Sequence, residues 1–499
     1  MKQRIDQRKG MLPRMKSHDW KTSIALIIVV IFLPSNPILS REVQKVHSFS
    51  APTRFRSRHK LRHSRHRLKS GSEFSDEVFH FLDRQPEVSY ADVDLPLNIL
   101  NAYPAMKNIG NKFIELERKR ENIDENNKNI ILLHLISTPT RLEECLPPKF
   151  QKDLTDYFNQ KKENDIVDTT NERQYSKVVH LHEDIWNFKR DIVHHRLMAQ
   201  LGLGVHFQIH ENHGGAGIRR IFARKTKVRR ITSSVAMPFL DENHLWGATK
   251  AKHNYGLFVK NESSSEDELV AVATFSAKRK VVRLGKQHRS HELLRFCSRR
   301  DSNVVGGISK LIKAFVAEKA PDDIVTVVDR DWGDGSGWHS LGFHTVATMD
   351  PIVMAVCDSS QTVDPSHSKR RHLVGAGIKS SDSASDKRTD RIGLSAHLLE
   401  ELDSLDSVDD ILDTLSRDKH FPVYDTGVER LMKVIAYDSN GKEVQTAPST
   451  IVEMWCNSQP TYAKDYYSPN RGIAVLLKNA AVTQSALPLL IGDTKNIGG

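Results

Sequence analysis

The residues best placed for chemistry form a glycine turn between two patterned segments. Residues 303–307 read Asn-Val-Val-Gly-Gly. Gly306 and Gly307 would let backbone N–H groups face an anion at the start of a helix. The turn therefore predicts a phosphate-binding site, and the alternative is a tight turn that only allows close helix packing. The candidate binding residues are Arg299, Arg300, Asn303, Val304, Val305, Gly306 and Gly307.

Acidic residues lie near the ends of the neighbouring segments. Glu292 stands at the start of an apolar run, where a carboxylate could deprotonate an amine; a solvated or salt-bridged strand end is the alternative. Asp329, Asp331 and Asp334 follow a second run. Open α/β sheets place ligands at such strand ends, but a loop capped by its own aspartates is also consistent. His339 could donate a proton or simply pack. The candidate catalytic residues are Glu292, Asp329, Asp331 and His339.

Three segments must position these residues. Residues 291–297 are a compact apolar run of strand length. Residues 308–319 have apolar side chains at helical spacing, and residues 323–329 alternate as a strand does. Strand, glycine turn, helix and second strand make a βαβ-type unit that could hold a phosphorylated cofactor.

Length and charge bound the possibilities. A chain of 499 residues suggests two or three domains. The net charge is +11, but residues 1–70 hold 17 Lys and Arg against three acids, so the remainder carries −3. Global basicity is therefore no argument for nucleic acid. Four cysteines without a C-x-x-C pair exclude a disulfide scaffold and a zinc site of that type.

The N-terminus has the composition of a targeting segment. Residues 24–33 are an apolar run preceded by basic residues and followed by Pro34 and Pro37, as in a signal peptide. Residues 54–69 are rich in Arg, His and Ser and contain no acid, as in a transit peptide. Together they resemble the bipartite plastid presequences of diatoms and related algae, with Phe49 at the junction. The alternatives are an uncleaved signal anchor and simple secretion.

The rest of the chain gives a coarser pattern. Residues 183–201 are predicted to form an amphipathic helix. Strands are predicted at 221–231, 253–259, 269–275, 432–435 and 443–454, and an acidic helix at 398–415. Residues 369–391 have a disordered composition. We find no internal repeat in the sequence.

Two further groups of residues could bind ligands. A dense basic run suits nucleic-acid phosphates, although a solvated face is the alternative; its candidate residues are Arg224, Lys225, Arg229 and Arg230. His180, His182, Glu183 and Asp184 could be the remnant of a metal site. Without partner carboxylates upstream, we predict no metal.

Many short segments occur in the order found in one nuclease family. They are 182–186, 223–225, 244–247, 255–257, 269–275, 292–297, 303–307, 329–343 and 424–427. This order resembles the region downstream of the nuclease site in phage-type, Vsr-like homing endonucleases, and it covers about half of the chain. The acidic catalytic strand of that family is not found in residues 71–175, so the resemblance implies a nucleic-acid-binding protein without endonuclease activity.

Residues 253–343 also resemble the GNAT acyltransferase fold. In that fold a strand leads to a turn whose amides hold the coenzyme A pyrophosphate at a helix start, and a further strand and a short helix ending in Gly-Phe follow. Residues 303–307 match the turn, and Leu341, Gly342 and Phe343 match the closing element. The tyrosine that often serves as general acid is replaced by Trp338. The resemblance implies binding of acetyl-CoA or a related acyl-CoA and an amine acceptor.

These observations predict an α+β or α/β protein with a GNAT-like mixed sheet flanked by helices. The expected parts are a targeting segment at 1–70, a poorly defined helical and polar region at 71–174, a nuclease-like linker at 175–252, a GNAT-like domain at 253–352, a disordered insert at 353–395 and an α/β extension at 396–499. The expected function is an acyl-CoA-dependent N-acyltransferase or a cofactor-binding relative, with DNA or RNA binding as the alternative. We expect plastid localisation through the ER and no stable membrane association once the presequence is removed. The acyl acceptor and the oligomeric state are not predicted.

Overall fold

The computed structural model describes residues 72–119, 129–163, 175–203, 218–260, 266–283, 285–357, 371–372, 394–405 and 407–437. All of these residues belong to one compact unit within residues 66–499. The predicted targeting segment and the predicted strand at 443–454 lie outside the described residues. Among the described helices, none is long and apolar enough to cross a membrane.

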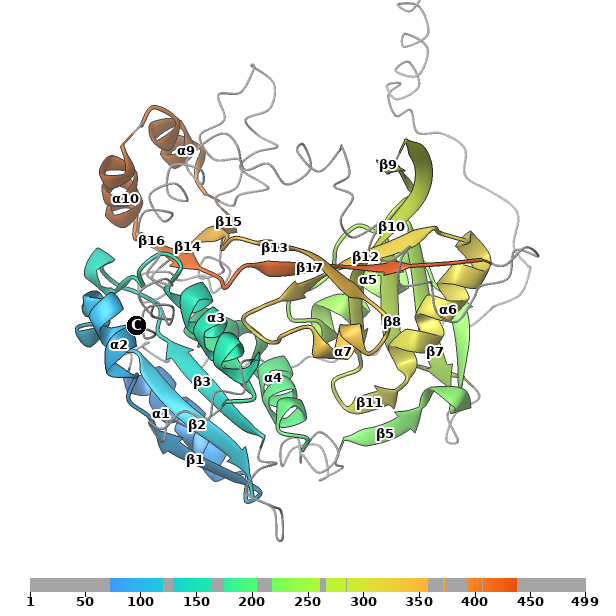
Figure 1. Ribbon diagram of the computed structural model, residues 1–499, viewed down its shortest axis with the longest axis horizontal. Helices are drawn as coiled ribbons and strands as arrows, with labels where there is room; N and C mark the ends of the chain where they lie inside the picture. Colours follow the sequence, from blue (N-terminus) through green and yellow to red (C-terminus); the bar gives the residue numbers. More distant parts are fainter. Residues whose placement is uncertain are drawn as a thin grey trace, which may run out of the picture. The chain divides into compact units, whose positions relative to one another are not determined.

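A mixed eight-stranded sheet dominates the described residues (Figure 1). Its order is β13-β17-β12-β10-β8-β7-β6, and β9 pairs with β10. All of its described pairs are antiparallel except β10 with β12. The strands are β6 (Thr226–Arg230), β7 (His253–Val259), β8 (Glu268–Phe275), β9 (Arg279–Arg283), β10 (Lys286–Ser298), β12 (Asp323–Asp329), β13 (His344–Met349) and β17 (Val428–Val434).

One helix covers each face of this sheet. Helix α6 (Gly307–Lys319) buries Phe315 in stacked contact with Phe275, with ring centroids 3.9 Å apart. Helix α5 (Ser233–Asn243) packs against Val272 on the other face. Because side chains alternate along a strand, Ala271 and Ala273 face α6 while Val272 faces α5. The predicted strands at 253–259, 269–275, 291–297 and 323–329 and the predicted helix at 308–319 are all confirmed.

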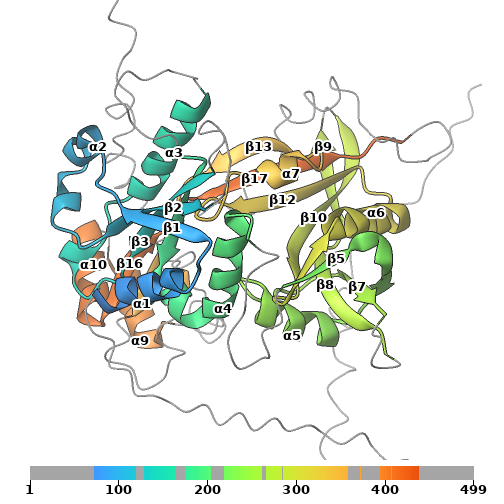
Figure 2. The same cartoon turned by 90° about the horizontal axis from the view of Figure 1, so that it is seen from below.

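A second sheet stands where a helical and polar region was predicted (Figure 2). Its order is β1-β2-β3-β4, formed by β1 (Val88–Asp92), β2 (Lys112–Arg118), β3 (Ile130–Ile136) and β4 (Lys177–His182). The prediction for 71–174 missed the strands β1, β2 and β3; of these, β3 is an almost continuous apolar run that is buried along most of its length and has no strand-like alternation to detect. Helices α1 (Ser72–Asp83) and α4 (Glu183–Gln200) cover one face, and α2 (Leu97–Ala102) and α3 (Phe150–Glu163) cover the other.

Smaller elements complete the described structure. Strands β5 (Arg219–Phe222) and β11 (Ser302–Val305) form a parallel pair. The predicted strand at 221–231 is interrupted by the 3₁₀ turn η5 (Ala223–Lys225), and short helix α7 (Ser336–His339) follows β12. Strands β14 (Val353–Cys357), β15 (Arg371–His372) and β16 (His420–Tyr424) form a third sheet, so the expected insert at 353–395 begins with a buried strand.

The predicted acidic helix at 398–415 is in fact two helices. They are α9 (Ala396–Asp403) and α10 (Val408–Arg417), and each begins at a serine whose hydroxyl accepts a backbone N–H: Ser395 for α9 and Ser407 for α10. Serine is a preferred N-cap residue, and its oxygen satisfies one of the N–H groups left over at a helix start. The second cap therefore begins a new helix instead of letting the first continue.

Candidate functional site

The parallel strands β10 and β12 separate along their length. They pair over three residues only, from Ser290 opposite Asp323 to Glu292 opposite Val325. Beyond that point β10 stays bonded to β8 as far as Ser298, and β12 stays bonded to β17 as far as Asp329. The Thr326 hydroxyl, which donates to the Leu293 carbonyl at 3.1 Å, marks the point of separation. We call this feature the strand divergence.

Of the predicted turn at 303–307, only Gly306 and Gly307 lie at the start of α6, whereas Asn303, Val304 and Val305 belong to strand β11. Gly306 is the N-cap of α6 with φ of +77°, a left-handed conformation that disfavours other residues. A side chain at Gly307 would meet Val304 at 3.0 Å and Leu257 at 3.3 Å, so the turn packs closely on β7. Helical bonding begins with the Lys310 N–H donating to the Gly306 carbonyl at 3.1 Å. The amides of residues 307–309 therefore have no acceptor within the helix, and the positive end of the helix dipole lies beside them.

The two arginines expected to add charge to this turn are bonded elsewhere. Arg299 pairs with Glu268 at 2.7 Å and with Asp301 at 3.1 Å. Arg300 pairs with Asp191 at 3.0 Å and with Glu242 at 3.4 Å. Arg299 and Arg300 are close to the glycines in the sequence, but the acidic residues that pair with them could not be predicted from that position.

Other cations lie beside the turn instead. A side chain added at Gly306 would lie 3.7 Å from Ala223 of η5, and Lys310 of α6 donates to the Ala223 carbonyl at 2.8 Å. Strand β5 pairs with β11 so that Phe222 is opposite Val305. Exposed Arg220 and Arg224 flank the Phe222 ring at 5.2 and 5.0 Å.

These cations belong to the basic run that the sequence assigned to nucleic acid. In the part of the chain that the structure describes, neither Arg220, Arg224 nor Lys225 forms an ion pair. Arg229 and Arg230 do, with Asp267 and with Glu318. Sequence reasoning could not connect η5 to the glycine turn, because about eighty residues and a long-range strand pair separate them.

Glu292 is the candidate catalytic residue that lies at the strand divergence. It is the last β10 residue paired with β12, and its side chain is largely buried. Its carboxylate accepts a hydrogen bond from Arg279 at 2.5 Å, and its backbone N–H donates to the Ser276 hydroxyl at 2.9 Å.

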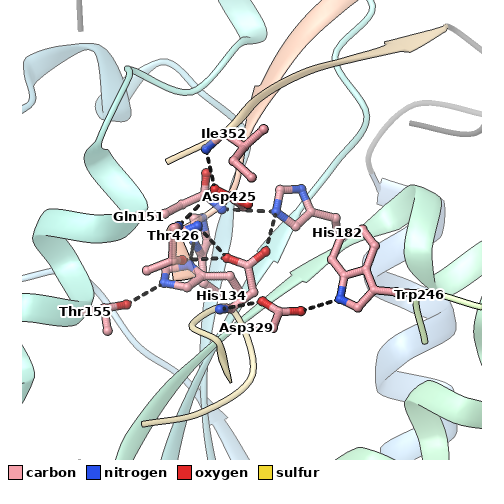
Figure 3. A network of polar contacts seen from close by, with 12 residues as sticks. His134, Gln151, Thr155, His182, Trp246, Asp329, Ile352, Asp425 and Thr426 are labelled. Carbon is pink, nitrogen blue, oxygen red and sulfur yellow. Dashed lines mark hydrogen bonds and ion pairs between the residues drawn. The ribbon is translucent and has the colours of Figure 1, made fainter. Parts of the chain in front are cut away.

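Asp329, which points toward Trp246 in Figure 3, and Asp331 hold the loop that follows β12. Asp329 accepts the Asp331 N–H at 3.0 Å and the Trp246 indole N–H at 2.8 Å. Buried Asp331 accepts the N–H of Thr426 at 2.8 Å and its hydroxyl at 2.5 Å. Asp334 accepts the Ser336 N–H at 3.1 Å. The alternative that we gave for this cluster, a loop capped by its own aspartates, describes Asp329 and Asp334.

His339 closes the turn after α7. Its Nδ1–H donates to the Phe343 carbonyl at 3.1 Å, and Trp338 packs edge-on against the Phe343 ring at 5.3 Å. The bonding is that of a packing histidine, which was the alternative given for this residue.

A buried histidine cluster connects the second sheet to the same loop. The Nδ1 atoms of His134 and His180 lie 3.0 Å apart, and Thr155 Oγ1 is 2.9 Å from His180 Nε2. Burial, and then the charge of His180, hold the pKa of His134 well below its ordinary value; burial and Arg330 lower the pKa of His180 to about 3. The backbone N–H of His180 donates to the Asp331 carbonyl at 2.9 Å.

The segment between α5 and β7 crosses from one diverging strand to the other. The Gly247 carbonyl accepts from Arg295 of β10 at 3.2 Å, while Trp246 donates to Asp329 of β12. His244 lies in this segment, and burial followed by Arg295, Arg196 and Lys189 lowers its pKa to about 3. It is therefore neutral among cations. Sequence reasoning missed it, because its neighbours come from three distant segments.

Comparisons with known proteins add little to this geometry. No family model and no curated protein matches the chain. Among solved structures, the chain is similar to the crystal structure of Eis1 from Mycobacterium abscessus, with 13% identity and a TM-score of 0.19. The match covers 33% of this chain and 42% of that chain. In the described residues, no group of three or more His, Cys, Asp or Glu side chains could hold a metal ion.

Proposed function

We propose that the chain is an acyl-CoA-dependent N-acyltransferase, or a cofactor-binding relative, with a GNAT-like fold. One observation carries the proposal. A parallel strand pair diverges directly before a left-handed glycine turn at a helix start. The GNAT resemblance implies both features, because the turn holds the coenzyme A pyrophosphate and the cofactor lies beside a splayed strand pair. Strand β12, helix α7 and the Gly342-Phe343 element follow in the expected order.

The charges favour a diphosphate at this turn. Helix N–H groups and the helix dipole stabilise anions. Arg220 and Arg224 supply guanidinium groups, which bind phosphate through paired N–H donors. Lys225 is exposed beside them. We therefore assign the cofactor charge to these three residues and not to Arg299 and Arg300.

Acyl transfer to an amine requires loss of a proton from the amine, attack of its nitrogen on the thioester carbonyl, and cleavage of the C–S bond with release of the coenzyme A thiolate, which takes up a proton. Glu292 is the candidate base, because it lies where the strands separate. Asp331 and His339 are engaged in loop contacts, and we propose a structural role for both. The same exposed cations could contact nucleic-acid phosphates, so DNA or RNA binding is the second candidate function.

Acetyl-CoA should raise the melting temperature of the wild-type chain. A ligand present at one hundred times its Kd and bound only to the folded state stabilises it by about 2.7 kcal/mol. Arg220→Glu with Arg224→Glu should abolish the shift, because each charge-assisted hydrogen bond contributes about 1.5–3 kcal/mol and the charges are now reversed. Differential scanning fluorimetry across an acetyl-CoA titration measures both.

Lys313→Glu is the matched control. Lys313 is an exposed cation on the same helix, about 9 Å further along its axis than Gly307. Its shift should equal that of the wild type. A wild-type melting temperature that millimolar acetyl-CoA leaves unchanged contradicts the proposal. Salt-dependent DNA or RNA binding that the double variant loses would then favour the second function.

A further inference from the structure

The second sheet repeats the connectivity of the large one. Strands β1, β2 and β3 are antiparallel neighbours, and β3 runs through α3 into its parallel neighbour β4. Strands β7, β8 and β10 are likewise antiparallel neighbours, and β10 runs through α6 into its parallel neighbour β12. Strands β9 and β11 are additions in the second set.

The β3–β4 pair and the β10–β12 pair can be aligned residue by residue from their first strand contacts. Ser176 N–H donates to the Ile130 carbonyl at 2.8 Å, and Asp322 N–H donates to the Arg289 carbonyl at 2.9 Å. The next pairs are Ile131 with Lys177 and Ser290 with Asp323. Lys177 therefore corresponds to Asp323.

The ends of these two strands then agree as well. Six residues after Lys177 and Asp323 come the acids Glu183 and Asp329, and three residues later come two buried tryptophans. The tryptophans are Trp186 and Trp332, and both belong to one hydrophobic cluster. The register was set by the strand pairs alone. The matching positions of the acids and the tryptophans therefore support the correspondence independently.

The helix starts correspond too. Helix α3 follows Lys149 with φ of +64°, and α6 follows Gly306 with φ of +77°. In each case the N–H four residues later bonds back to that carbonyl: Asp153 N–H at 2.8 Å and Lys310 N–H at 3.1 Å. A left-handed lysine costs about 1–2 kcal/mol. Glycine adopts this conformation without that cost.

The two sets differ where a cofactor would enter. Strands β3 and β4 pair over six residues, from Ile131 with Lys177 to Ile136 with His182, whereas β10 and β12 part after three. The positions that correspond to Leu293 and Thr326, where the second set parts, are His134 and His180. Their hydrogen bond joins the two strands at that point.

We propose that residues 88–186 (the first repeat) and 253–332 (the second repeat) are two copies of one unit, and that only the second binds acyl-CoA. The identity of the ligand rests on the proposed function. The first repeat has lost both the strand divergence and the glycine turn. Its remaining role is to support the second, because it bonds the loop after β12 through His180 N–H to Asp331 and through Asp156 to Arg330.

The turn equivalence is tested by stability alone, without any ligand. Lys149→Gly removes a left-handed side chain and should raise the melting temperature of the full chain by about 2 °C. Lys250→Gly is the control, because this exposed lysine has no positive φ and glycine there only adds freedom to the unfolded chain. It should lower the melting temperature. If Lys149→Gly lowers the melting temperature as much as Lys250→Gly does, the equivalence of the turns at Lys149 and Gly306 is overturned.

The functional asymmetry is tested by isothermal titration of the full chain with acetyl-CoA. We expect one site per chain, with Lys149→Glu leaving the affinity within twofold of the wild type and Arg224→Glu lowering it at least tenfold. Two sites per chain, or a tenfold loss in Lys149→Glu, would overturn the asymmetry. If the wild type binds no acetyl-CoA, the proposed function fails, and the stability pair alone decides whether the two repeats are copies.

Discussion

Gly427→Ala should prevent the chain from folding stably. Gly427 has φ of +83°, and a side chain there would lie 2.2 Å from the Met349 carbonyl oxygen and 3.1 Å from the Asp350 carbonyl carbon. These are backbone atoms of β13 and of the loop after it, so rotation of a neighbouring side chain cannot relieve the clash. We expect a loss of more than about 4 kcal/mol in the free energy of unfolding.

The effect should extend to the candidate site. Gly427 precedes β17, whose first residue, Val428, pairs with Asp329. Its carbonyl accepts the Arg330 N–H at 3.3 Å, and neighbouring Thr426 bonds Asp331. Gly337→Ala is the control, since a side chain there meets nothing within 4 Å. Urea denaturation followed by circular dichroism compares them. If the free energies of unfolding of Gly427→Ala and Gly337→Ala differ by less than about 1 kcal/mol, the start of β17 is not as described here.

Acid should destabilise the folded chain through its buried histidines. The folded-state pKa values of His134 and His180 are lowered, so both stay neutral in the folded chain while the unfolded chain protonates them near pH 6.5. The free energy of unfolding therefore does not change with the titration of these histidines above pH 6.5, and it falls as the pH drops below that value. The slope is about 1.4 kcal/mol per pH unit for each histidine. Between pH 6.5 and 4.5 the pair should remove up to about 5 kcal/mol.

A double variant isolates this contribution. His134→Leu with His180→Thr installs the residues that occupy the corresponding positions in the second repeat, Leu293 and Thr326. Its free energy of unfolding should fall much less steeply with acid than that of the wild type. The exposed histidines His344 and His397 give the control, as His344→Thr with His397→Leu. Urea unfolding at a series of pH values measures the slopes. Equal slopes in the wild type and the first variant would mean that the pair is solvated.

Local patterns were enough to predict most elements of the second repeat, but not β9 or β11. The apolar run of β10, the helical spacing of α6 and the alternation of β12 are properties of contiguous residues, and the glycine turn was visible between them. The first repeat was missed because β3 is an almost continuous apolar run without strand-like alternation, and because its turn carries Lys149 where the second has Gly306. The two copies share strand register and helix-cap geometry, which no comparison of residue types reveals.

The candidate site was predicted in part for the same reason. Gly306 and Gly307 indicated a turn from neighbouring residues alone. The charges around the turn depend on pairing between strands that are far apart in the sequence. Arg299 and Arg300 are close in sequence and bonded to acids, whereas Arg220 and Arg224 reach the turn through the pairing of β5 with β11. Asp331 looked catalytic because it follows a strand, and its bonds to Thr426 could not be foreseen from residues almost a hundred positions away.

The central claim is that acyl-CoA binds at the α6 turn and along the strand divergence. A crystal structure of the full chain with acetyl-CoA tests it most directly. We expect diphosphate oxygens about 3 Å from the amides of residues 307–309, guanidinium groups of Arg220 or Arg224 on the phosphates, and the pantetheine chain beside residues 293–298 of β10. Acetyl-CoA bound elsewhere, or β10 and β12 hydrogen-bonded along their whole length in the complex, would contradict the claim.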